Sequence, residues 1–204
     1  MLLALSFVCG YLIGSVPTAY LLVKKKAGID IRESGSGNVG GFNAFRVTES
    51  KSVGYTVGIL DGIKGLTAVL LSGYILSDSF WIKGVALLGS VVGHNYPLWL
   101  KFKGGRGLAT ACGGLFLIGV SYIAIWCTLW VLLYQLWHDI LRANIVCTIV
   151  TPLLILVLPG SLVYATMVSS ATAEQYLLFT GSLSLILLIS HRDEVRNILR
   201  SKGN

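Results

Sequence analysis

Residues Val53–Leu76 read VGYTVGILDGIKGLTAVLLSGYIL, and of these 24 residues only Asp61 and Lys64 are charged. A transmembrane helix needs about 20 mainly apolar residues, so this stretch is long enough to cross a bilayer. Asp61 and Lys64 lie three positions apart and therefore share one face of the helix. Because a charge in the hydrocarbon core is costly, we expect both to face the interior of a helix bundle, as a structural ion pair or as a substrate contact.

Similar apolar stretches recur along the whole chain. Of its 204 residues, 54% are hydrophobic and 12% are charged, whereas a typical soluble domain is about 25% charged. The composition predicts an all-α polytopic protein with a single integral-membrane domain, residues 1–204, folded as a seven-helix transmembrane bundle. The expected helices cover Leu2–Val23, Val53–Leu76, Phe80–Leu100, Leu108–Ile118, Tyr122–Trp137, Asn144–Leu158 and Thr172–Ser190. The fourth is short for a span, and one continuous helix through Gly119–Ser121 would leave six spans as the alternative.

The positive charges predict how these helices are oriented. With seven helices and the N-terminus outside, fourteen of the sixteen Lys and Arg residues fall on the cytoplasmic side, as the positive-inside rule expects. Lys64 lies within a helix and only Lys83 falls near the outside, so the C-terminus is expected in the cytoplasm. Lys24–Lys26 follow the first apolar stretch instead of preceding it, and we expect that helix to be retained rather than cleaved as a signal peptide.

A polar loop rich in glycine, SGSGNVGGFNAFR, occupies Ser34–Arg46 between the first two apolar stretches. Glycines allow backbone N–H groups to converge on an anion, and Arg46 could add a bidentate phosphate contact. The alternative is a flexible linker, but a linker would not need the amides and the arginine. The candidate phosphate-binding residues here are Ser34, Gly35, Ser36, Gly37, Asn38, Gly40, Asn43 and Arg46.

A second loop, KFKGGRG at Lys101–Gly107, repeats this chemistry directly before an expected helix. The free N–H groups and the dipole at a helix N-terminus attract anions, which Lys103, Gly104, Gly105 and Arg106 would help to bind. The loop lacks the GKS or GKT ending of a nucleotide-binding P-loop. A positive-inside loop would explain its charges but not its glycines. Both loops are expected on the cytoplasmic side, which indicates handling of phosphorylated molecules at the membrane surface.

The remaining polar residues do not form a familiar catalytic set. No nucleophile triad, metal site or redox motif is recognisable, and the four cysteines lie in or beside apolar stretches as expected for small buried residues. His94 fits a satisfied interior histidine, whereas His191 beside Arg192 is the stronger catalytic candidate. Glu49 or Asp193 could act as a base, but neither has an evident partner. Phosphate substrates that bring their own leaving group can react by positioning and charge stabilisation alone.

Taken together, these motifs resemble those of the bacterial membrane acyl-phosphate:glycerol-3-phosphate acyltransferases, the Y-type enzymes of phospholipid synthesis. The resemblance covers nearly the whole chain. It rests on Gly14–Ser15, Ser34–Arg46, Asp61–Gly65, Gly93–Pro97, Phe102–Thr110 and His191–Arg192. It implies a seven-helix fold in the bacterial inner membrane, with the active site on the cytoplasmic face.

The resemblance also implies a reaction in which an acyl phosphate donates its acyl chain to the 1-hydroxyl of glycerol 3-phosphate, giving 1-acyl-glycerol 3-phosphate and phosphate. Ser36 and its neighbours would hold a phosphate, while Arg46, Lys103 and Arg106 would neutralise charge. The catalytic residues implied are Ser36, Arg46 and His191. Thr110 and Arg192 belong to the implied substrate site, and His191 would orient or proton-couple the acceptor. No cofactor, metal, nucleic acid or obligatory protein partner is implied; the expected partners are the two substrates and membrane lipids.

This sequence departs from the family pattern at four places. Phe42 stands where the family usually has Thr, and Arg106 where it usually has Lys. The third motif reads His-Arg-Asp-Glu, so that Glu194 replaces an amide, and serines are missing near Arg142–Asn144. These changes leave open a paralogue that acylates another acceptor. An organic-phosphate or lipid transporter is a further alternative, although the polar groups crowd one face and no inverted repeat is visible.

Overall fold

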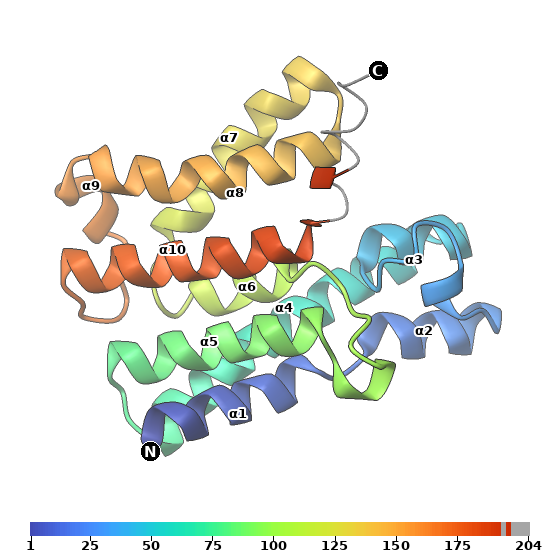
Figure 1. The fold of residues 1–204 in the computed structure, drawn as a ribbon, viewed down its shortest axis with the longest axis horizontal. Helices are drawn as coiled ribbons and strands as arrows, with labels where there is room; N and C mark the ends of the chain where they lie inside the picture. The colour runs from blue at the N-terminus through green and yellow to red at the C-terminus, as the bar shows by residue number, and fades with distance from the viewer. Residues whose placement is uncertain (193–194, 197–204) are drawn as a thin grey trace. The chain divides into compact units, whose positions relative to one another are not determined.

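The computed structural model describes residues 1–192, 195 and 196, and this part of the chain is built from helices and connecting loops (Figure 1). The α-helices are α1 Leu2–Gly14, α2 Thr18–Ala27, α3 Gly41–Thr48, α4 Lys51–Ile75, α5 Phe80–Asn95, α6 Leu108–Leu115, α7 Ser121–Trp137, α8 Ile140–Val157, α9 Gly160–Tyr164 and α10 Ala173–Ser190. Two short 3-10 helices, η1 Ile31–Glu33 and η2 Leu98–Leu100, lie in the loops.

Several helices are suited to a membrane. Within the described residues, four helical stretches are long and apolar enough to cross a bilayer: Leu2–Ala27, Lys51–Ile75, Ile140–Val157 and Ala173–Ser190. The apolar helix Ser121–Trp137 is slightly shorter. Large side chains such as Leu70, Leu153 and Leu185 are exposed on these helices, as expected for surfaces that face lipid. The prediction of an all-helical membrane protein with several spans is confirmed.

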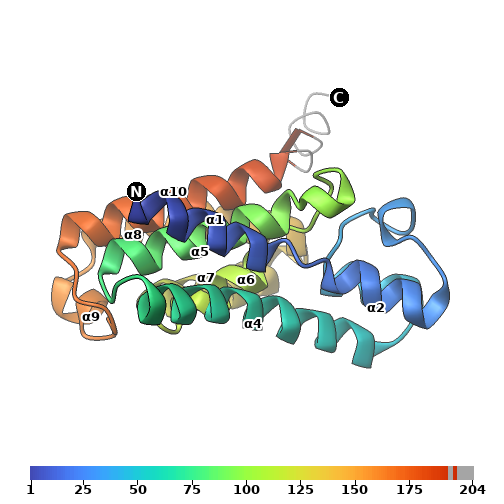
Figure 2. The ribbon, with the colours of Figure 1, turned by 90° about the horizontal axis from the view of Figure 1, so that it is seen from below.

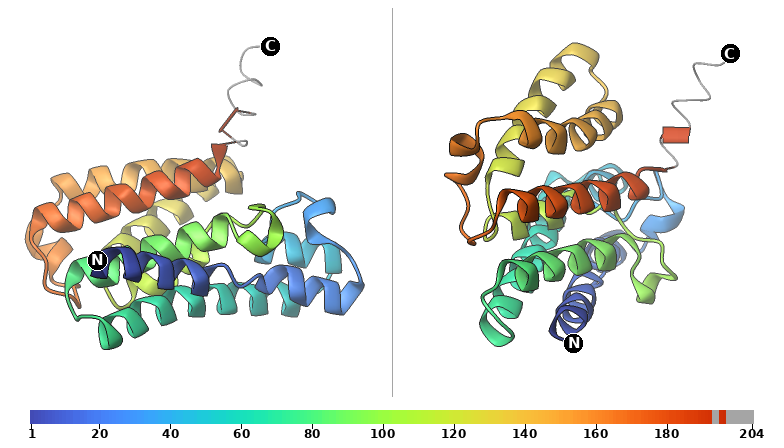
Figure 3. Two further views of the ribbon diagram at one scale, coloured as in Figure 1. Left: turned by 60° about the horizontal axis from the view of Figure 1, so that its bottom comes forward. Right: turned by 60° about the vertical axis from the view of Figure 1, so that its left-hand side comes forward.

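The chain forms two compact units, Met1–Leu117 with α1 to α6, and a second unit that begins at Ile118 with α7 to α10. In the first unit, α1 lies beside α5, and Figure 3 shows this pairing from two further directions. The long helix α4 contacts α1, α5 and α6, and the short helices α2 and α3 pack against it (Figure 2). In the second unit, α8 packs against both α7 and α10.

Small residues bring the helices of the first unit into backbone contact. A Cβ atom added at Gly14 of α1 would lie 2.0 Å from the Ser90 carbonyl oxygen of α5. One added at Gly65 of α4 would lie 1.9 Å from the Thr110 carbonyl oxygen of α6. Membrane helices commonly associate through such small-residue faces, because close backbone approach increases van der Waals contact. The first contact fixes α5 against α1, and the second fixes α4 against α6.

The first expected helix, Leu2–Val23, is not continuous, which corrects the prediction. α1 ends at Gly14 with Ser15 as its C-cap, the chain is not helical at Val16–Pro17, and α2 begins at Thr18. Pro17 has no N–H to donate and disfavours helical geometry at Val16, which explains the break. The break leaves the Val16 carbonyl oxygen available to a side chain of α4.

Among the other helix boundaries that differ from the sequence expectation, two lie next to the glycine loops. The helix expected over Phe80–Leu100 ends at Asn95, because Pro97 cannot continue it, and η2 follows. The segment Ser34–Arg46, expected to be a loop throughout, becomes helical at Gly41, so that Arg46 lies in the last turn of α3. α3 is amphipathic and buries Asn43 and Ala44, and this tertiary burial offsets its two N-terminal glycines.

Candidate active site

The first glycine loop is organised by one buried amide. The Asn43 side chain is 1% exposed, and its Oδ1 accepts a hydrogen bond of 3.0 Å from the Ser36 backbone N–H. Its Nδ2 donates to three backbone carbonyl oxygens, those of Ile31 (3.3 Å), Ser34 (3.0 Å) and Asn38 (3.0 Å). Asn43, predicted to bind substrate, thus fixes the path of the loop and has little capacity left for a ligand.

The glycines shape the turn that carries Ser36. Gly35 and Gly37 have φ angles of 61° and 72°, a region that glycine adopts without a steric cost. A Cβ atom at Gly35 would lie 2.3 Å from Asn43 Oδ1, so the turn also needs the absence of a side chain there. Ser36 is exposed at the tip, whereas Ser34, Asn38 and Gly40 are half-buried. The turn therefore presents the Ser36 hydroxyl at the surface.

Arg46 lies exposed at the end of the first loop, whereas an ion pair fixes the residues before the loop. Arg46 is exposed in the last turn of α3. Val39, seven residues earlier in the same loop, is buried. Upstream, Asp30 accepts hydrogen bonds from the Arg32 guanidinium at 3.0 Å and 2.6 Å, and this bonding lowers the pKa of Asp30 to about 2. The Arg32 guanidinium also lies 5.2 Å from the centre of the Tyr20 ring.

The second glycine loop contacts the first directly. Gly104 N–H donates to the Asn95 carbonyl oxygen and Gly105 N–H to that of His94, both at 3.1 Å. The Gly104 carbonyl oxygen in turn accepts from the Val39 N–H at 3.3 Å, which joins the two loops. A shared apolar core lies beneath them and includes Ala19, Val23, Ile31, Val39, Ala44, Val57 and Leu100. The two glycine loops therefore lie next to each other in the first unit.

The cationic residues of the second loop are at least partly exposed, whereas Thr110 is buried. Lys103 is exposed and Arg106 is half-buried. α6 begins directly after the loop, with Gly107 as its N-cap at a φ angle of 81°. Thr110 is fully buried in this helix, and its Oγ1 has no hydrogen-bond partner among the described residues. Thr110, predicted to belong to the substrate site, is therefore not accessible at the surface, unlike Lys103.

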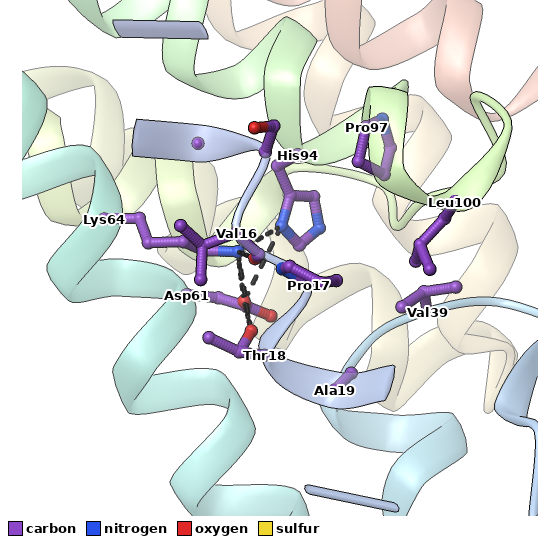
Figure 4. Close-up of a pocket in the computed structure, with 12 residues that line it drawn as sticks. Val16, Pro17, Thr18, Ala19, Val39, Asp61, Lys64, His94, Pro97 and Leu100 are labelled. Carbon is purple, nitrogen blue, oxygen red and sulfur yellow. Dashed lines mark hydrogen bonds and ion pairs between the residues drawn. The ribbon is translucent and has the colours of Figure 1, made fainter. Parts of the chain in front are cut away.

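A buried polar cluster next to the loops was only partly foreseen from the sequence. Lys64 Nζ lies 2.8 Å from Asp61 Oδ1 and donates to the Val16 carbonyl oxygen at 2.9 Å. It also lies 3.3 Å from Nδ1 of His94, while the Thr18 hydroxyl donates to Asp61 at 2.5 Å (Figure 4). The spacing of Asp61 and Lys64 predicted that both face the interior, as an ion pair or as a substrate contact, and the structure pairs them. His94 of α5 and the α1–α2 break also contact this pair. These contacts depend on tertiary packing and could not be predicted from the local sequence.

The chain matches the sequence model of the family described as glycerol-3-phosphate acyltransferase over residues 4–201. It is 33% identical to a glycerol-3-phosphate acyltransferase of Ehrlichia chaffeensis, over 98% of this chain and 95% of that one. A glycerol-3-phosphate acyltransferase of Mesorhizobium japonicum is 31% identical, over 97% and 92% of the two chains. The chain belongs to the glycerol-3-phosphate acyltransferase family.

Solved structures of this acyltransferase family resemble the fold. Crystal structures of PlsY (YgiH), an integral membrane glycerol 3-phosphate acyltransferase, superpose with TM-scores of 0.79 for the glycerol 3-phosphate form and 0.76 for the lysophosphatidic acid form. Each is 28% identical to this chain and covers 98% of it and 92% of the solved chain. The resemblance inferred from the motifs is therefore confirmed at the level of the family and of the fold.

The remaining predicted site residues of this acyltransferase lie in the second unit. His191 is fully buried at the end of α10, and its Nδ1 lies 2.8 Å from the Leu187 carbonyl oxygen. Arg192 is exposed. Asp193 and Glu194, where the third motif departs from the family pattern, lie outside the described residues. Ser36, Arg46, Lys103 and Arg106 thus all belong to the first unit, whereas His191 belongs to the second. The role of His191 stays a prediction.

Proposed function

We propose that this chain transfers a fatty acyl group from an acyl phosphate to the 1-hydroxyl of glycerol 3-phosphate, giving 1-acyl-glycerol 3-phosphate and inorganic phosphate. Its membership of the glycerol-3-phosphate acyltransferase family supports the acceptor and the reaction class. The single structural observation that carries the proposal is the hydrogen bond between Val39 and Gly104, which joins two glycine loops with cationic residues. Both substrates carry a phosphate, and one joined surface could bind two phosphoryl groups.

The chemistry needs little from the protein beyond binding and charge. The acceptor hydroxyl attacks the acyl carbonyl carbon, the bond from that carbon to the phosphate oxygen breaks, and the hydroxyl proton passes to the departing phosphate. Backbone N–H groups, the Ser36 hydroxyl, Arg46 and Lys103 would stabilise the negative charge, which is the largest contribution in many acyl transfers. His191 would orient the acceptor. The acyl chain would lie against the apolar helices, reached from the bilayer.

The purified chain should release phosphate from palmitoyl phosphate only when glycerol 3-phosphate is present. The test uses protein in detergent or lipid mesophase and measures phosphate and 1-acyl-glycerol 3-phosphate together, with glycerol and other phosphorylated alcohols as comparison acceptors. Equal consumption of acyl phosphate with and without any acceptor would contradict acyl transfer. Product from a different acceptor alone would identify a paralogue. Passage of either substrate into proteoliposomes without consumption would favour a transporter.

We also propose a seven-span topology with the N-terminus outside, the C-terminus in the cytoplasm, and the two loops on the cytoplasmic face of a bacterial inner membrane. The bias of Lys and Arg toward one side supports it. A cysteine in place of Ser36, which is exposed at the tip of its turn, should react with an impermeant maleimide only in inside-out vesicles. The experiment requires replacing the native cysteines first. Labelling in right-side-out vesicles would invert the topology.

A further inference from the structure

A buried polar cluster lies directly behind the second glycine loop. It consists of Asp61 and Lys64 from α4, His94 from α5, and Thr18 with the Val16 carbonyl oxygen from the α1–α2 break. Asp61, Lys64 and His94 are only 2%, 7% and 8% exposed. They line a small pocket that also reaches Val39 of the first loop and Pro97. Neither the phosphate-binding loops nor the proposed reaction gives these groups a task.

We propose that Asp61, Lys64 and His94 form a positioning network that sets the loop Lys101–Gly107 against the loop Ser34–Arg46 for phosphate binding. Lys64 is the centre of this network, because its ammonium group contacts Asp61 of its own helix and two other elements at 3.3 Å or less, through the Val16 carbonyl oxygen and His94. A charged Lys64 can only donate, so Nδ1 of His94 accepts and the ring hydrogen lies on Nε2.

The other edge of the His94 ring touches the loop. A Cβ atom at Gly105 would lie 2.1 Å from His94 Nε2 and 2.7 Å from the Val39 carbonyl oxygen, so the glycine fits between the ring and the first loop. The His94 carbonyl oxygen also accepts from the Gly105 N–H at 3.1 Å. A shift of the ring would therefore move Gly105, and with it Arg106 and the contact to Val39.

Positioning explains the network better than stability does. A buried ion pair must overcome the desolvation of both charges, and replacing both partners with uncharged groups is often neutral or stabilising. Removing one partner alone strands a buried charge and is destabilising. A double replacement therefore separates the two roles, because it restores stability without restoring the link from Lys64 to His94 and to the Val16 carbonyl oxygen.

The test compares Lys64→Met with the double variant Asp61→Asn/Lys64→Met in the full-length chain in detergent. The single variant should be thermally destabilised, and the double variant should recover most of the lost Tm. We expect both to raise the KM for glycerol 3-phosphate by about tenfold or more, since small misplacements of binding groups have large kinetic effects. A variant that only lost folded protein would show a lower kcat at an unchanged KM.

Hydrogen–deuterium exchange provides a second measurement that does not need activity. In the double variant, exchange should become faster in residues 101–107 and at Val39, and should stay unchanged in α1. Lys83→Met is the control, because it removes another Lys–Asp pair, in which Lys83 Nζ lies 2.6 Å from Asp78 Oδ1. Lys83 belongs to α5, the helix of His94, and lies about 16 Å from His94 along that helix. It should leave KM and loop exchange as in the wild type.

The proposal rests on the proposed function, but the two can fail separately. If the wild-type chain shows no acyl transfer, the proposed function is wrong, and loop exchange alone decides on the network. If the double variant has a wild-type KM and wild-type loop exchange, the network is structural only and the positioning role is overturned.

Discussion

Replacing Arg46 with Ala should lower the rate of acyl transfer by about 100-fold or more, because a planar bidentate contact to phosphate is lost. Arg46 is exposed at the end of α3, so its removal leaves the Asn43 hydrogen bonds and the apolar core of the loop intact. Lys103→Ala should have an effect in the same direction from the second loop. Arg46→Lys should be intermediate, since it keeps the charge but loses the fork geometry.

The matched control for these variants is Lys26→Ala. Lys26 is an exposed cation of the same unit, in the last turn of α2, and belongs to neither glycine loop. Initial rates would be measured for all variants over a range of both substrates, with Tm recorded alongside. A Lys26→Ala rate as low as that of Arg46→Ala would indicate a general electrostatic effect. Wild-type rates in both Arg46→Ala and Lys103→Ala would contradict the assignment of the loops.

Gly104→Ala should reduce activity to a similar or larger degree, for a steric reason. The added Cβ atom would lie 2.1 Å from the His94 carbonyl oxygen and 2.7 Å from that of Asn95. Backbone atoms cannot move aside as a side chain can, so the loop must shift and weaken its hydrogen bond to Val39. A misplacement of about 1 Å can cost about 100-fold in rate.

Gly58→Ala is the matched control for this substitution. It lies in α4, and a Cβ atom there would meet nothing within 4 Å. Replacing an interior helix glycine with alanine in open space should be neutral or stabilising by up to about 1 kcal/mol. Rates would be compared well below the Tm of each variant, using monodisperse fractions. A Gly104→Ala variant with the activity of Gly58→Ala would show that the close approach of the second loop to α5 is dispensable.

The sequence predicted those features that depend on local pattern. Long apolar stretches indicated helices, the spacing of Asp61 and Lys64 indicated an interior pair, and glycine with cationic residues indicated the loops. The break at Ser15–Pro17 was missed, because the flanking residues remain apolar on both sides. The helical part of the first loop was missed as well, since its burial against the rest of the unit outweighs its glycines.

Contacts between residues far apart in the sequence could not be predicted from local sequence patterns. The role of Asn43 as an organiser of the loop depends on carbonyl groups five to twelve residues away. His94 meets Lys64 across 30 positions of sequence, and that meeting requires α4 and α5 to pack at a particular register. A lone histidine in an apolar stretch carries no signal of its partner. Family membership, by contrast, was recognisable from the motifs because their order spans the whole chain.

The most direct test of the central claim is a structure of the full-length chain determined with glycerol 3-phosphate and a non-hydrolysable acyl phosphate in a lipid mesophase. Phosphate oxygens should lie within hydrogen-bond distance of the Ser36 turn and Arg46, and of Lys103 or Arg106. Phosphates bound elsewhere, with both glycine loops empty at saturating ligand, would show that the loops do not bind the substrates.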